Sequence, residues 1–424
     1  MNNIKTILDK AQGLKGYRIT GAETNSYELF FVHRNLETVR STDTVSADVT
    51  VYVEHDGKIG ESSFHVYKSM TDEDIAAKIE TAKSRALLMS NEPYELAPAG
   101  TLEAELPTDL NEYAPDELGR MIADAVFAAD TVPGGSINAL EIFIYRTVIH
   151  VINSRGVDKK QTVHRVMIEA IPTFTDEKQS VELYEDYRFT NFDAAKLTAE
   201  IAEKLREASD RVKAEKPEKE LEINVVLRPA EIEELAYELA WDCNYQTIYS
   251  HANLHAKGDD LQQGDGDKLT ITMKAVVPGS EHSAFFDSDG STLKDTVVIR
   301  DGIVADSFGS IRFGQYLGVE EPSGSLTCLK MEPGTLTDED LASEPYIECA
   351  SMSGMQLDLF NDYIGGEIRL AYYHDGSTVK PLTGISMSAK LSDVLATMRL
   401  HEKTDIRGAF DGPVKLLMKN VKVL

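Results

Sequence analysis

The clearest hydrophobic pattern in the chain is helical and begins at Pro229. Apolar or small residues recur at spacings of three and four, which places one row of them along a single side of a helix: Ile232, Leu235, Ala236, Leu239, Ala240 and Cys243. Pro229 suits the first helical position, because its missing N–H leaves no hydrogen bond unmade there. The sequence therefore predicts a buried helix over residues 229–243.

The polar side of this predicted helix is unusual because all its charged residues are acids: Glu231, Glu233, Glu234, Glu238 and Asp242. Acids in the first turn are favoured by the helix dipole, whereas like charges four residues apart repel slightly. No histidine lies between His164 and His251. The helix therefore cannot offer two histidines to a metal ion.

The first half of the chain contains two stretches with the same order of predicted elements. Each reads as a helix, a run of strands and a closing helix, over residues 1–95 and 113–210. The segment YELFFVH from Tyr27 returns as LEIFIYR from Leu140, which suggests a duplication. The strands are expected at 27–34, 36–42, 45–54 and 59–67 in the first unit, and at 140–146, 148–153, 161–171 and 180–187 in the second. Antiparallel strands with helices on one face give an α+β fold.

Two polar segments divide the chain. Residues 91–115 contain four prolines and read as a surface connector, and the charged stretch 210–222 reads as a linker between domains. We therefore expect an N-terminal α+β domain over 1–215 and a C-terminal domain over 222–424. Beyond the helix at 229–243, the C-terminal domain is mostly β in pattern, which favours a curled sheet or barrel.

Composition excludes several classes of function. The net charge is −28 with a pI near 4.7, so binding to nucleic acid or to an anionic membrane surface is disfavoured. No apolar run approaches the length of a membrane span, and the first residues lack the apolar core of a signal peptide. Three unpatterned cysteines fit a reducing compartment. The expected location is the cytoplasm.

Candidate metal ligands are weak in this sequence. His251 and His255 have the i, i+4 spacing of helical ligands, but the segment is polar, has no evident third ligand and lacks the H-E-x-x-H signature. Two solvated loop histidines are the favoured interpretation. The acidic stretch 259–267 does not match an EF-hand loop and is better explained as a solvated turn.

Candidate catalytic groups are equally sparse. Asp287 and Asp289 stand at the end of a predicted strand, where paired carboxylates sometimes act as acid and base, but a turn into Gly290 explains them adequately. No histidine is near any of the three cysteines in sequence, so a cysteine nucleophile is disfavoured without being excluded.

Several stretches, taken in order, resemble the TldD/PmbA family, once called modulators of DNA gyrase. They are YELFFVHRNLETVRST, VYVEHDGKIGESS and IHVINSRG in the first half, and 283–318 and 363–398 in the second. The resemblance covers nearly the whole chain. It implies a two-domain α+β protein that pairs as a dimer. In the TldD branch, H-E-x-x-x-H on the helix after the domain boundary and a cysteine near the C-terminus hold zinc, and the assembled protein cleaves peptides in an internal cavity.

This sequence departs from the catalytic branch at both ligand positions. Its matching helix reads EELAYELAWDCN, and Asp405-Ile-Arg-Gly stands in place of the cysteine. The resemblance therefore implies a PmbA/TldE-like subunit with no metal of its own, zinc being expected only in a TldD-like partner. Ser250, Asp287, Asp289 and Gly290 are our candidates for lining the peptide cavity, with no catalytic residue assigned.

Two alternatives stay open at this point. One is a homodimeric protein that binds peptides or acts as a scaffold without catalysis. The other is a stand-alone metallohydrolase that uses His251 and His255 with a further ligand. The partners expected are a TldD-like paralogue or a second copy of the chain, together with a peptide substrate.

Overall fold

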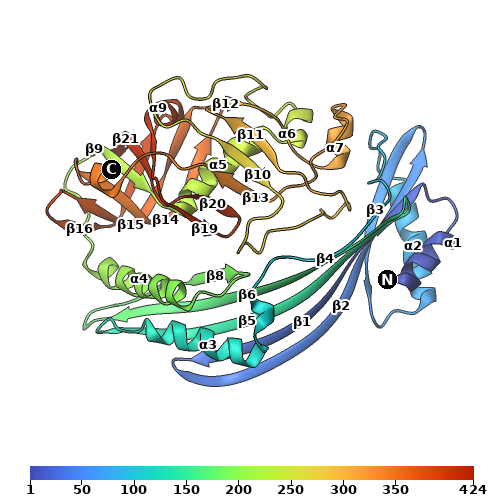
Figure 1. Cartoon of the computed structure of the whole chain (residues 1–424), viewed down its shortest axis with the longest axis horizontal. Helices are drawn as coiled ribbons and strands as arrows, with labels where there is room; N and C mark the ends of the chain where they lie inside the picture. The colour runs from blue at the N-terminus through green and yellow to red at the C-terminus, as the bar shows by residue number, and fades with distance from the viewer.

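The computed structural model describes residues 1–424, the side chain of Asn2 excepted. A long curved sheet forms the N-terminal half, and the C-terminal half lies against one side of it (Figure 1). The strands of this sheet are β1 (Gly16–Val32), β2 (Asn35–His55), β3 (Lys58–Tyr67), β4 (Gly100–Glu105), β5 (Gly135–Asn153), β6 (Val157–Thr175), β7 (Ser180–Glu182) and β8 (Glu185–Phe189). Their order is β3-β2-β1-β5-β6-β4, with β7 and β8 also pairing with β6.

Helices cover one face of this sheet. They are α1 (Asn2–Lys10), α2 (Asp72–Ala86), α3 (Pro115–Ala128) and α4 (Ala194–Lys213), with a short 3-10 turn, η1 (Leu110–Glu112), before α3. Successive strand residues point to opposite faces, so Ile19 packs in the core under α1 and α2 while Arg18 points to the other face. A separate core, which includes Leu29 and Ile142, lies under α3 and α4. Both units have the predicted order of helix, antiparallel strands and helix.

The predicted strand boundaries need correction. The predicted strand 27–34 is the end of a longer strand, β1, which stops at Val32 before a turn at 33–34. Residues 36–42 and 45–54 are one strand, β2, without a break. The polar residues 42–44 do not interrupt β2, because this part of the strand is exposed on both faces. The predicted connector 91–115 contains β4, which adds to β6 in parallel and alternates in burial as an edge strand does.

The C-terminal half contains two further sheets. Its strands are β9 (Leu221–Leu227), β10 (Ile271–Lys274), β11 (Thr296–Arg300), β12 (Ile303–Val304), β13 (Cys328–Met331), β14 (Tyr346–Asp358), β15 (Tyr363–His374), β16 (Val379–Leu382), β17 (Ile385–Ala389), β18 (Arg399–Leu400), β19 (Thr404–Arg407), β20 (Phe410–Pro413) and β21 (Leu416–Val423). The order β14-β9-β21-β17-β15 closes on itself because β14 also pairs with β15. This closed ring confirms the predicted barrel, and β12-β11-β10-β13-β20-β19 forms a second, open sheet.

The central helix, α5 (Pro229–Asp242), lies in the core that these two sheets share. The predicted apolar row is buried along its whole length, from Ile232 to Cys243. Four shorter helices complete the half: α6 (Tyr245–Tyr249), α7 (Ile311–Tyr316), α8 (Asp338–Leu341) and α9 (Leu391–Thr397). No helix in the described chain is long and apolar enough to cross a membrane.

Candidate functional site

The loop after Phe286 attaches the C-terminal half to the face of the long sheet that carries no helices. Arg18 of β1 forms an ion pair with Asp289 of this loop. Lys159 of β6 donates from Nζ to the carbonyl oxygen of Gly290 at 2.7 Å and to the hydroxyl of Thr292 at 2.8 Å. Beside these polar contacts, Phe286 and Ile311 pack on sheet residues in a small apolar core. The loop is thus held by both charge and burial.

The turn that presents Asp289 is built by its neighbours. One oxygen of Asp287 accepts the backbone N–H groups of Asp289 and Ser291, each at 3.0 Å, and the other accepts the N–H of Ser325 at 2.9 Å. Burial raises the pKa of Asp287, although the hydrogen bonds oppose that shift. Gly290 has a φ of +81°, and a Cβ there would lie 2.7 Å from Cγ1 of Val157. Asp287 and Gly290 therefore act as turn residues, in agreement with the turn interpretation from the sequence.

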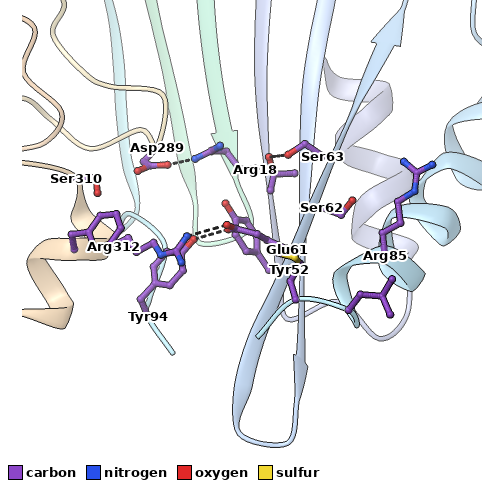
Figure 2. Close-up of a pocket in the computed structure, with 14 residues that line it drawn as sticks. Arg18, Tyr52, Glu61, Ser62, Ser63, Arg85, Tyr94, Asp289, Ser310 and Arg312 are labelled. Atoms are coloured by element: carbon purple, nitrogen blue, oxygen red, sulfur yellow. Dashed lines mark hydrogen bonds and ion pairs between the residues drawn. The ribbon is translucent and has the colours of Figure 1, made fainter. Parts of the chain in front are cut away.

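A cavity of about 660 Å³ opens beside this turn, between the long sheet and the C-terminal half (Figure 2). Its polar and aromatic lining comes from both halves: Arg18, Thr50, Tyr52, Glu61, Ser62, Ser63, Arg85 and Tyr94 from the first, and Asp289, Ser310, Arg312 and Phe313 from the second. Apolar side chains add to it at Leu88 and Met89. Of the candidates from the sequence, only Asp289 lines this cavity.

Arg312 is the most constrained cation of the cavity. Its Nη1 lies 3.0 Å from Oε1 of Glu61, so this ion pair, like the one at Arg18, joins the two halves. The guanidinium also lies 5.4 to 5.6 Å from the ring centres of Tyr94, Phe313 and Tyr316. The hydroxyl of Tyr94 donates to Oε2 of Glu61 at 3.2 Å, and burial raises the pKa of that hydroxyl. These residues carry no signal in the sequence, since no local pattern links strand β3 to α7.

The other candidates lie elsewhere. The hydroxyl of Ser250 donates to the carbonyl oxygen of Gln246 at 2.9 Å at the end of α6, away from the cavity lining. His251 is exposed and has a φ of +56°. Nδ1 of His255 lies 3.0 Å from Oδ2 of Asp242. Burial alone would raise the pKa of Asp242, but hydrogen bonds from His255 and two backbone N–H groups outweigh it and lower the pKa.

The acidic face of α5 is covered by the hairpin of β19 and β20. Burial raises the pKa of Glu233 to about 7, against the opposing charge of Arg407 and a hydrogen bond from the backbone of Ala409. On the same hairpin, Oδ1 of Asp405 lies 2.6 Å from Nζ of Lys196, on α4. The cation missing from the helix itself is therefore supplied from the C-terminal hairpin.

These residues do not fit a zinc centre. Zinc in proteins is held by thiolate, imidazole and carboxylate donors in a closed tetrahedral arrangement. At the helix and the hairpin, the donors present are glutamates that feel the charge of Arg407 and an aspartate that pairs with Lys196. Among the described residues, no three His, Cys, Asp or Glu side chains are grouped as a metal ion would require. We therefore assign no chemical step to a metal in this chain.

The three cysteines are free and buried. Burial raises the pKa of the Cys243 thiol to about 12 and raises the pKa values of Cys328 and Cys349 as well. A buried thiol that keeps its proton is a poor nucleophile.

Comparison with known proteins agrees with this architecture. Residues 220–424 match the family model described as the PmbA/TldA metallopeptidase C-terminal domain. By this domain, the chain belongs to the PmbA/TldD family. A search of curated proteins gives no match.

Three solved structures have the fold of this PmbA/TldD family chain. A proposed modulator of DNA gyrase from Thermotoga maritima is 15% identical with a TM-score of 0.79, covering 100% of this chain and 99% of that one. TldE from Thermococcus kodakarensis is 14% identical with a TM-score of 0.80 and the same coverage. A proposed modulator of DNA gyrase from Bacteroides thetaiotaomicron is 13% identical with a TM-score of 0.82, covering 99% and 97%. At these identities the likeness describes the fold alone.

Proposed function

We propose that this PmbA/TldD family chain is a TldE-like subunit that carries no catalytic metal and joins a zinc-bearing TldD-like partner in a cytosolic peptidase. The observation that carries the proposal is the contact between α5 and the β19–β20 hairpin. There, Glu233 accepts a hydrogen bond from the backbone of Ala409 and feels the charge of Arg407, at the place where catalytic relatives are expected to hold zinc. Without such a metal, the subunit has no means of lowering the pKa of a bound water toward 7.

The role of the subunit would be to complete the peptide cavity of its partner. The family model and the overall likeness to TldE from Thermococcus kodakarensis support this role. The cavity at Asp289 supports it too, because it lies at the junction of the two halves and presents both charged and aromatic groups. An extended peptide is the expected ligand, held in part by strand addition.

An exposed strand edge supports the expectation of a partner chain. Within the described chain, the first part of β2, from Asn35 to Val45, pairs only with β1, since β3 begins its pairing at Ser46. Large apolar side chains are exposed on this hairpin, with exposed fractions of 45 to 51%: Val32, Leu36, Val39 and Val45. Long edges of this kind are normally covered, so the hairpin is the surface proposed for the partner.

Co-expression with an H-E-x-x-x-H paralogue from the same genome tests the proposal. We expect the two chains to co-purify, zinc to remain well below one ion per copy of this chain alone, and peptide hydrolysis to require both. If this chain forms a stable homodimer and ignores the paralogue, it is better described as a peptide-binding scaffold. Stoichiometric zinc on the isolated chain would instead favour a stand-alone hydrolase and overturn the proposal.

A single substitution locates the partner surface. Val39→Lys places a charge on the exposed edge of β2 and should reduce co-purification about tenfold or more, because a buried unpaired charge costs several kcal/mol. Val379→Lys is the matched control, since Val379 is equally exposed on strand β16. Equal losses in both variants would show that the surface was placed wrongly.

A further inference from the structure

One cation of the junction cavity has no protein partner. Arg18 and Arg312 are paired with Asp289 and Glu61, whereas the side chain of Arg85, at the end of α2, forms no ion pair among the described residues. The lining thus holds three arginines against two acids, in a chain whose net charge is −28. The cavity is a local site for a negative group on an acidic protein.

The rim beside Arg85 is apolar and exposed. Leu88 is 84% exposed and Met89 is 49% exposed, and both line the cavity. Leu87 is 51% exposed between them and the helix. Consecutive exposed side chains of this size, next to an unpaired guanidinium, suit a ligand that joins an apolar group to an anion.

The floor of the cavity is a free strand edge. Glu61, Ser62 and Ser63 belong to β3, the last strand of the long sheet. Apart from a single bridge between Ile59 and Asn91, β3 pairs only with β2 in the described chain. Its outer backbone groups can therefore pair with an added strand. Figure 2 shows Ser62 and Arg85 on one side of this strand, with Arg312 and Asp289 on the other.

We propose that this cavity binds the carboxyl-terminal end of an extended peptide. The peptide backbone adds to β3, its last side chain packs on Leu88 and Met89, and its terminal carboxylate lies against Arg85 and the hydroxyl of Ser62. A free strand edge favours a peptide over other apolar carboxylates such as fatty acids, which have no backbone to pair. The inference rests on the proposed function, since it names the end of the peptide that the cavity takes. Its test is separate, because capture of a peptide end requires neither a metal nor a partner subunit.

The test uses the full-length chain alone. A pool of N-acetylated hexapeptides with an apolar last residue is selected on the immobilised protein, and the recovered peptides are resynthesised with a free carboxylate or a terminal amide. By fluorescence anisotropy, the carboxylate form should bind about tenfold more tightly, the usual worth of one charged hydrogen bond. Arg85→Gln should remove that preference. Arg206→Gln is the matched control, because Arg206 is an exposed helical arginine on α4 with no ion pair in the described chain.

A second variant tests the contribution of the apolar rim. Leu88→Ser should weaken both peptide forms equally and leave the preference for the carboxylate intact. Equal binding of acid and amide by the unmodified chain, or an unchanged preference in Arg85→Gln, would overturn the proposal. So would decanoate or inorganic phosphate displacing the peptide at micromolar concentration. None of these outcomes depends on the paralogue, so failure here is distinct from failure of the proposed function.

Discussion

Two of the contacts between the halves of the molecule use similar residues differently. Near the barrel, Arg228 lies at the start of α5 and reaches Glu207 and Glu348, each at 2.7 Å, and Glu203 at 3.1 Å. The side chains of Glu207 and Glu348 are 2% and 11% exposed. The positive charge of Arg228 is therefore neutralised by carboxylates of the protein itself.

At the contact around Arg18 and Asp289, one charged side chain has no partner of opposite charge. Arg18 and Asp289 are paired at partly exposed positions, 22% and 26%, at the edge of a cavity that also holds the unpaired Arg85. The comparison suggests that charge density does not distinguish a structural contact from a binding site. What distinguishes them is an unpaired donor beside open space.

The largest loss of stability should come from removing the charge of Arg228. Arg228→Met leaves Glu207 and Glu348 buried without a counter-charge, and breaking a buried ion pair costs about 3–5 kcal/mol. Urea unfolding would measure the loss. Arg120→Met, at an exposed pair with Asp116 on α3, should cost less than about 1 kcal/mol. Equal costs would mean that the Arg228 contact is not structural.

Acid should weaken the same contact. Burial alone would raise the pKa of Glu348, but His374 and Arg228 outweigh it and lower the pKa from 4.5 to about 2. Because the folded pKa lies below the unfolded value, the stabilisation is complete above pH 4.5 and is lost as the pH falls toward 2, by about 3 kcal/mol.

Comparison of two variants separates the contribution of the Glu348 carboxyl to this fall of stability from that of other groups. Glu348→Gln should show a flatter fall of stability between pH 4.5 and 2 than the unmodified chain. Glu344→Gln, at an exposed position in the segment just before β14, should keep the original profile. A Glu348→Gln profile as steep as that of the unmodified chain would assign the acid sensitivity to other groups.

Sequence patterns were sufficient where burial dictates the residue type. The row from Ile232 to Cys243 predicted α5 because a helix packed between two sheets needs apolar residues along its whole buried side. The hairpin turn at Asp56 and Gly57 was also readable, because both residues have positive φ. The exposed part of β2 was predicted as a strand only over 36–42, and its continuation through 43–44 was missed, since a strand without a buried face carries no alternation.

The cavity could not be read from the sequence, because its residues share no local pattern. Arg18 and Asp289 are 271 positions apart, and Glu61 and Arg312 are 251 apart. They are brought together where the loop at Gly290 docks onto β5 and β6 and where α7 docks onto residues 92–95. Asp289 was selected because it follows a predicted strand, where the structure has only an isolated bridge between Phe286 and Thr292. That prediction gave its place in a turn but no indication of Arg18 as its partner.

A smaller loss of stability is expected at Gly290, in the loop that carries Asp289 to the long sheet. Gly290→Ala adds a Cβ 2.7 Å from Val157 at a φ of +81°, which should cost about 2–3 kcal/mol. Gly279→Ala has a similar φ of +91° but meets nothing within 4 Å, so it should show only the backbone cost of about 1 kcal/mol. Thermal unfolding of the two variants separates close packing from backbone strain. Equal losses of stability in the two variants would mean that the close packing of Gly290 against Val157 contributes nothing to stability.

The smallest effect on stability is expected at the ion pair between Arg18 and Asp289. Arg18→Gln removes one partner of Asp289, but both side chains are partly exposed and water can solvate the remaining carboxylate, so the cost should be under about 1 kcal/mol. Urea unfolding beside Arg228→Met gives the comparison directly. A loss of stability at Arg18 as large as the loss at Arg228 would show that the pair with Asp289 is also a structural contact. The difference between the two contacts would then depend on the unpaired Arg85 alone. A small loss leaves the arginines at this edge of the cavity free to exchange a protein carboxylate for that of a ligand at little cost in folding.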